Sequence, residues 1–226
     1  MQFTIEHAPV YATLRVDMEQ GERFRAEPGA MLSMSPSIEL ETTTAGKGLM
    51  GTIKAAVGGE SIFASIYNAV HARGELLLAP AHPGDIVRID LQQQTILAYG
   101  GAYLAGDVGL TMSARGSFKS MVSGHDLFLS VLSGTGPVFL SSFGAVYART
   151  LGVGESYVVD TGHIVAFTDG MHYSIKTASR GLFSSFASGE GLVCLFTGPG
   201  TIWMQTRNVP GFAKSLVPYL PTGSGG

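Results

Sequence analysis

The stretch Ser188–Arg207, which reads SGEGLVCLFTGPGTIWMQTR, decides the fold. Before the Gly-Pro-Gly sequence, Cys194 and Phe196 fall on one face of an extended chain. After it, Ile202 and Met204 continue the same alternation. Side chains that alternate between two faces are typical of β-strands, and a short glycine-rich connection is typical of a tight turn. The stretch therefore predicts a hairpin of two strands.

Two glycine-marked patterns of this kind each occur three times along the chain. In the first, a glycine precedes an apolar strand, a glycine turn and a second strand, starting at Gly74, Gly136 and Gly191. In the second, a strand ends at a glycine and another apolar strand follows, at Gly29, Gly101 and Gly162. The two patterns interleave in the same order, and their spacing is longer and less regular than in a solenoid. We therefore predict an all-β fold of three related β-modules.

These patterns divide the chain into approximate modules at residues 1–70, 71–130 and 131–212. No change in composition marks a linker between them, so the modules are predicted to form one body. Residues 48–57 favour a short helix, which Gly58 and Gly59 would end. Phe212–Leu216 favours a helical turn, and residues 213–226 are predicted to form a flexible tail that closes on the sequence Gly-Ser-Gly-Gly.

The composition is unusually poor in charge. Charged residues make up 14% of the 226 residues, well below the roughly 25% of an ordinary globular domain. A monomer would expose much uncharged surface, so we expect a homo-oligomer. The formal net charge is −3 and the sequence has no run of Lys or Arg, which argues against nucleic acid as a partner.

Three further features predict a cytoplasmic location. The single cysteine, Cys194, excludes an intrachain disulfide framework and suits a reducing compartment. The sequence that opens the chain, MQFTIEH, lacks the charged and apolar regions of a signal peptide. No stretch offers the ~20 consecutive apolar residues that span a bilayer.

Residues 47–60 are the least β-like part of the chain and carry the candidate contact residues. An amphipathic helix there could touch a membrane surface or a partner protein, since an apolar face flanked by basic side chains suits an interface. The alternative is a helix packed across an open end of the first β-module. The contact residues on the first interpretation are Lys47, Leu49, Met50, Ile53 and Lys54.

The sequence resembles the AIM24 family, a group of largely uncharacterised function named for a mitochondrial inner-membrane relative. The resemblance rests on Pro28–Met31, Gly58–Ser61, Tyr103–Ala105, Gly189–Gly191, Phe196–Gly200 and Gln205–Arg207, in that order. It implies three tandem domains similar to the tryptophan RNA-binding attenuation protein, each a small double-stranded β-helix or β-sandwich with pseudo-threefold repetition. It also implies a homotrimer, a ring of nine domains. The family carries no agreed catalytic residues, so none is transferred.

Motifs for catalysis or cofactor binding fail on inspection. The only Gly-Lys pair near a phosphate-loop pattern is followed by Gly48, and Glu41 stands where the first glycine belongs. No two histidines lie within four residues of each other, unlike the paired histidines of a cupin strand. Cys194 sits in an apolar strand without nearby positive charge, which favours core packing over a reactive thiolate. We predict no enzyme, no cofactor and no metal site.

Three functional hypotheses follow. The first is a non-enzymatic homotrimeric β-ring that acts as a scaffold or binding platform for an unidentified protein or small ligand. The second is an RNA-binding regulator similar to the attenuation protein, although the basic cluster that such a protein needs is missing. The third is a membrane-surface organiser that makes peripheral contact through residues 47–60.

Overall fold

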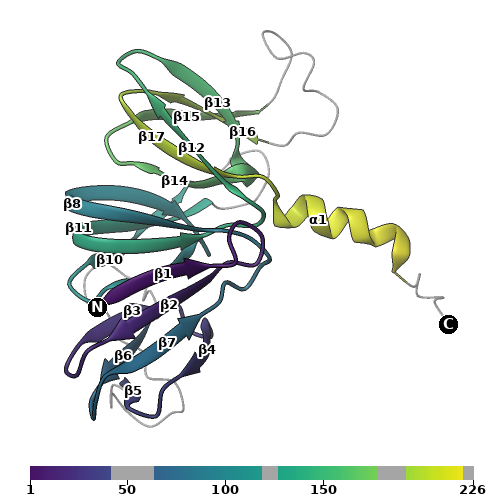
Figure 1. Cartoon of the computed structure of the whole chain (residues 1–226). Helices are drawn as coiled ribbons and strands as arrows, with labels where there is room; N and C mark the ends of the chain where they lie inside the picture. Colours follow the sequence, from purple (N-terminus) through teal and green to yellow (C-terminus); the bar gives the residue numbers. More distant parts are fainter. Residues whose placement is uncertain (42–63, 119–126, 178–191, 221–226) are drawn as a thin grey trace.

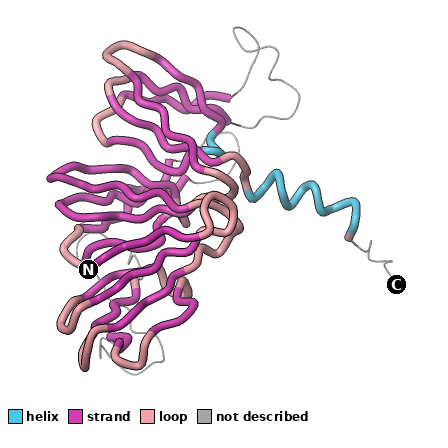
Figure 2. Tube along the Cα trace, in the orientation of Figure 1, coloured by secondary structure: helices cyan, strands magenta, loops and turns pink. Residues whose placement is uncertain are grey.

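A computed structural model describes residues 1–41, 64–118, 127–177 and 192–220, and most of them lie in antiparallel β-strands (Figures 1 and 2). The prediction of an all-β fold is therefore confirmed. The predicted helix at 48–57 lies outside the described residues. The strands are β1 (Gln2–Glu6), β2 (Thr13–Met18), β3 (Arg23–Ala26), β4 (Met31–Met34), β5 (Ile38–Glu41), β6 (Ser65–Ala69), β7 (Gly74–Leu78), β8 (Ile86–Tyr99), β9 (Tyr103–Asp107), β10 (Thr111–Phe118), β11 (Leu127–Ser141), β12 (Val146–Leu151), β13 (Ser156–Asp160), β14 (Ile164–Thr168), β15 (His172–Thr177), β16 (Leu192–Thr197) and β17 (Gly200–Gln205).

One pairing scheme occurs in three successive strand groups. In the first group, β7 lies between β2 and β4, and β6 lies between β3 and β5. In the third, β17 lies between β12 and β14, and β16 lies between β13 and β15. In the second, the long strands β8 and β11 each supply two strands of the scheme, with β9 and β10 as the others. We call these sets group 1 (β2–β7), group 2 (β8–β11) and group 3 (β12–β17).

The last strand of each group pairs back onto the first, so the groups span residues 13–78, 86–141 and 146–205. The module end predicted at 70 falls before β7, and the one predicted at 130 falls within β11. The predicted strand-glycine-strand pattern is present in each group, because Gly29, Gly101 and Gly162 each lie between two strands. Group 3 adds a short 3₁₀ turn, Thr161–His163, at this point.

The stretch Ser188–Arg207 does contain two strands, β16 and β17, but they do not form the predicted hairpin. β16 pairs with β13 and β15, whereas β17 pairs with β12 and β14 in another sheet. Both edges of each strand are thus occupied, and Gly198–Gly200 turns a corner between two sheets. The corner is held by the backbone N–H of Gly198, which donates to the carbonyl oxygen of Glu155 at 2.9 Å.

The alternation predicted for these strands is confirmed, since Cys194, Phe196, Ile202 and Met204 are all buried. They belong to the apolar core of group 3. Two further cores lie beneath groups 1 and 2, so the core is divided along the chain as the strands are. In Figure 1 the sheets lie one above another, from β5 and β6 at one end to β13 and β15 at the other.

Helix α1 (Val209–Leu216) leaves this β-body and projects away from it (Figures 1 and 2). The Asn208 side chain caps its first turn, with Oδ1 accepting from the N–H of Gly211 at 2.7 Å. None of its eight residues is buried. The predicted helical turn is therefore part of a longer helix, and a 3₁₀ turn at Val217–Tyr219 continues into the predicted tail.

Candidate functional site at two open strand edges

The sequence-predicted contact residues are not placed by this structure. Lys47, Leu49, Met50, Ile53 and Lys54 lie outside the described residues, so their role remains a prediction. In the part of the chain that is described, no helix is long and apolar enough to cross a membrane.

Cys194, the nucleophile considered from the sequence, has the environment of a core residue. It is 2% exposed, and burial raises the pKa of its thiol to about 12. A thiol with this pKa is protonated at neutral pH and is a poor nucleophile. Across the described ranges no group of three or more His, Cys, Asp or Glu side chains is placed to hold a metal ion.

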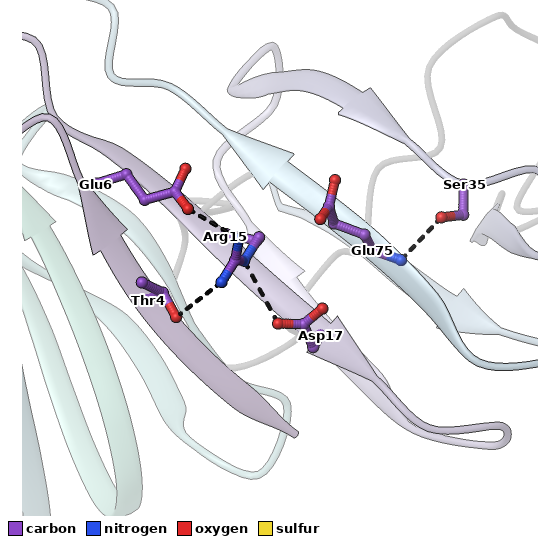
Figure 3. Close-up of polar contacts among 6 residues, drawn as sticks. All are labelled: Thr4, Glu6, Arg15, Asp17, Ser35 and Glu75. Atoms are coloured by element: carbon purple, nitrogen blue, oxygen red, sulfur yellow. Dashed lines mark hydrogen bonds and ion pairs between the residues drawn. The ribbon is translucent and has the colours of Figure 1, made fainter.

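The outer face of the β1–β2 pair carries a compact polar cluster, drawn in Figure 3. Arg15 lies between Glu6, at 2.9 Å from its Nη1, and Asp17, at 3.4 Å from its Nε. Its Nη2 also donates to Thr4 Oγ1 at 3.5 Å. Partly exposed ion pairs of this kind contribute only about 0–1 kcal/mol each. Arg15 thus links β1 to β2 through its pairing with Glu6, and the cluster is explained as a surface contact between two strands.

Neither of two hollows in the structure defines a ligand site, because one is too small and the other has mixed charge. An apolar cavity of about 20 Å³ between groups 2 and 3 is lined by residues that include Tyr99, Leu129 and Cys194. That volume holds about one water molecule. An open polar hollow of about 270 Å³ lies near the N-terminus, beside Asp17, Glu19 and Arg73. Its acidic and basic side chains face the same open space, so neither charge dominates it.

Adjacent groups are joined by antiparallel strand pairings, which we call seams. Both seams have the same arrangement. At the first seam, β3 of group 1 pairs antiparallel with β9 of group 2, placing Ala26 opposite Ala105. At the second, β8 pairs with β14 of group 3, placing Ala98 opposite Ala166. Through these two ladders, strands from all three groups form one ten-stranded sheet, and β4 and β13 lie in two smaller sheets.

The strand that enters each seam is fully buried there. In β9 the first four residues are buried, and Leu104 packs in the core of group 1. In β14 the first four residues are likewise buried, and Val165 packs in the core of group 2. Leu104 is 0% and Val165 is 1% exposed. Each group thus completes the core of the group before it.

β4 is the counterpart of β9 and β14 in group 1, but among the described strands it pairs only with β7. It is held on one side by β7, where Ser35 Oγ accepts from the backbone N–H of Glu75 at 2.9 Å (Figure 3). Its other side faces no described strand. All four of its residues are exposed, and Leu32, the counterpart of Leu104 and Val165, is 59% exposed.

β13 of group 3 is also an open strand edge, but it corresponds to the strands that pair with the following group. It is the counterpart of β3 and of the second half of β8, which both pair with the next group. β13 pairs only with β16 among the described strands, so its outer edge is free. The described strands therefore leave two unlike edges open, β4 and β13, which correspond to the two kinds of strand that join groups within the chain.

Sequence reasoning missed this site, although one signal was present. An apolar residue stands three positions after each glycine of the second pattern, at Leu32, Leu104 and Val165. Their shared position in the pattern makes all three candidates for a core. The sequence does not show that Leu32 lacks a neighbouring group, because that depends on which strands the fold brings together.

Comparison with known proteins gives a consistent result. The family described as "Mitochondrial biogenesis AIM24" matches residues 3–207. An uncharacterised protein of Streptococcus pyogenes serotype M6 is 33% identical over 99% of this chain and 93% of its own length. An X-ray crystal structure of a Streptococcus pyogenes protein from a structural genomics consortium is 29% identical, with a TM-score of 0.78, and covers 97% of this chain and 99% of that one. The strand pattern, the glycine signatures and the match over nearly its whole length agree: the chain belongs to the AIM24 family.

Proposed function

We propose that this protein is a non-enzymatic scaffold, a homotrimeric β-ring whose surfaces bind an unidentified protein or small ligand. The observation that carries the proposal is the pair of unlike strand edges at β4 and β13. Unlike edges join head to tail, and a heterologous contact of this kind forms a closed ring when its rotation closes. Three chains of three strand groups give a ring of nine groups, the assembly that the resemblance to the attenuation protein implies.

Exposed apolar surface at one of these edges supports an assembled state. Met31, Leu32 and Met34 are large apolar residues on β4, and all of them face solvent in the isolated chain. An open apolar strand edge invites further strand pairing, and natural proteins usually cover or charge it. A second copy would cover it. The low charge content of the chain agrees with a protein whose surface is partly buried by its own copies.

The proposal places function on surfaces rather than in a catalytic centre. The buried thiol of Cys194 is protonated at neutral pH, and Arg15 is paired with Glu6 and Asp17. We place the protein in the cytoplasm, where a single reduced cysteine is expected. RNA is a weaker candidate ligand, because the chain is acidic overall, with a net charge of −3.

The assembly is tested by the absolute mass in solution, measured by light scattering during size-exclusion chromatography at two loading concentrations. We expect three times the chain mass of 23.7 kDa at both concentrations. A chain that stays at 23.7 kDa throughout contradicts the ring. Reproducible turnover of a substrate by the purified protein would contradict the non-enzymatic part of the proposal.

A further inference from the structure

We propose that β13 of one copy pairs antiparallel with β4 of the next, in a register fixed by the two seams inside the chain. The inference rests on the proposed ring and specifies its contact. The partner is a second copy of this chain, because the chain already joins its own groups through the same two kinds of strand.

The register follows from positions counted from the glycine of each group. At the first seam, Phe24 is five residues before Gly29, and it pairs with Asp107, six residues after Gly101. At the second seam the offset is the same, since Ile96 pairs with Thr168. The offset is shared although the two seams differ in sequence, so the backbone geometry of the groups determines it.

Applied to the open edges, this offset gives the pairing between copies. Tyr157, five residues before Gly162, pairs with Ser35, six residues after Gly29. Val158 then lies opposite Met34 and Val159 opposite Ser33, as Arg25 lies opposite Gly106 and Ala26 opposite Ala105. The proposed contact therefore consists of three residue pairs: Tyr157–Ser35, Val158–Met34 and Val159–Ser33.

A backbone irregularity in β4 supports the match of β4 to its counterparts. The register between β4 and β7 shifts between Met31 and Ser33, around Leu32. The same shift occurs in β9 around Leu104 and in β14 around Val165. β-bulges redirect a side chain locally, and here the two internal examples direct it into the core of the preceding group. Leu32 is therefore built to enter the core of group 3 in the adjacent copy.

This contact gives the assembly a direction. β4 meets β13 and never a second β4, so neither open edge pairs with its own equivalent in another copy. Mixed single-cysteine variants can detect that direction. Residues directly opposite in an antiparallel ladder have Cα atoms about 4.5–5.5 Å apart, within the range of a disulfide.

The experiment mixes Val158→Cys chains with Met34→Cys chains under a mild oxidant. We expect a disulfide-linked dimer in the mixture and none from either variant alone. Cys194 can stay in place, because its buried thiol has a pKa of about 12 and is not ionised near pH 8. A mixture of Asp160→Cys and Met34→Cys is the register control; it is displaced by two residues and should cross-link at least about ten times more slowly.

A second measurement does not depend on disulfide geometry. Leu32→Asp places a charge where the neighbouring core should be, and the isolated chain should tolerate it because Leu32 is exposed. We expect the oligomer mass to be lost while the circular dichroism spectrum is kept. Leu40→Asp, on the exposed part of β5, is the matched control and should keep the oligomer.

The outcomes separate this inference from the proposed ring. A trimer that resists Leu32→Asp, or that cross-links faster through Asp160→Cys, overturns the contact and leaves the ring standing. Efficient linkage of Val158→Cys chains to one another also overturns it, because that requires a twofold contact. Directional cross-links in an assembly of other than three chains support the contact and overturn the trimer.

Discussion

At the scale of single residues, Glu27 shows how a seam affects a carboxylate. It follows β3, and its backbone N–H donates to the carbonyl oxygen of Leu104 across the first seam at 2.8 Å. Desolvation by burial raises the pKa of its side chain above the ordinary value of 4.5. The folded chain therefore holds this proton more tightly than the unfolded chain does. It follows that folding loses stability as pH rises from the unfolded pKa through the folded pKa.

Glu27→Gln is therefore expected to raise the melting temperature at neutral pH, because the amide carries no charge to desolvate. The gain should shrink as pH falls below 4.5, where the wild-type carboxyl is protonated in both states. Thermal unfolding followed between about pH 3 and pH 8 checks this. A gain that is independent of pH would point to a cause other than ionisation.

Glu155→Gln is the control with the opposite sign. The pKa of Glu155 is lowered by a hydrogen bond from the backbone of Gly152 and then by one from Arg149, so its charge favours folding above the unfolded pKa. Its substitution should lower the melting temperature at neutral pH. The loss should disappear in acid, where the wild-type carboxyl is protonated in both folded and unfolded chains.

At the scale of elements, the connections between groups approach each other at backbone contact distance. Gly84, which precedes β8, forms a parallel bridge with Gly144, which precedes β12. The N–H of Asp85 donates to the carbonyl oxygen of Gly144 at 3.0 Å. A Cβ atom at Gly84 would lie 1.8 Å from the carbonyl oxygen of Ser142. Only glycine fits at this crossing without moving a backbone.

Gly84→Ala should consequently lower the free energy of unfolding, by about 1–3 kcal/mol if the connections separate to make room. Urea unfolding measures the loss. Gly152→Ala is the matched control, since a Cβ there would meet only Glu155 Oε2 at 3.9 Å. Equal losses in the free energy of unfolding for the two variants would show that the close backbone approach at Gly84 does not cause the destabilisation.

How far the sequence predicts these elements depends on the range of the interaction. Alternation is local, so the burial of Cys194 and Ile202 could be predicted correctly. Strand partners are not local, and the hairpin predicted across Gly198–Gly200 was wrong because β13, β15, β12 and β14 occupy the available edges. The open edge at Leu32 was missed for the same reason.

At the scale of the whole molecule, the proposed assembly links stability to concentration. Association between folded chains stabilises only the folded state, so the melting temperature should rise with protein concentration. A concentration 100 times the dissociation constant adds about 2.7 kcal/mol, or roughly 5–10 °C for a chain of this size. Calorimetry over a dilution series measures the trend.

The Leu32→Asp and Leu40→Asp variants test whether this concentration dependence comes from the proposed contact. Leu32→Asp should melt at one temperature at every concentration, because its chains do not associate. Leu40→Asp should follow the wild-type trend, since β5 takes no part in the proposed contact. A wild-type melting temperature that ignores concentration while the protein is diluted from trimer to monomer would refute this linkage.

In such an assembly, helix α1 would be a repeated binding element. Its Phe212 ring meets Phe143 of the β-body at a centroid distance of 5.3 Å, while Leu216 remains exposed further along. Cyclic symmetry would present this helix three times on one face of the ring. A partner that holds each helix only weakly, but carries several matching sites, then gains avidity of about 10²–10⁴ through effective concentration. The exposed apolar residues of α1, which bind too weakly in one copy, would then bind a target with repeated sites more tightly than a target with a single site.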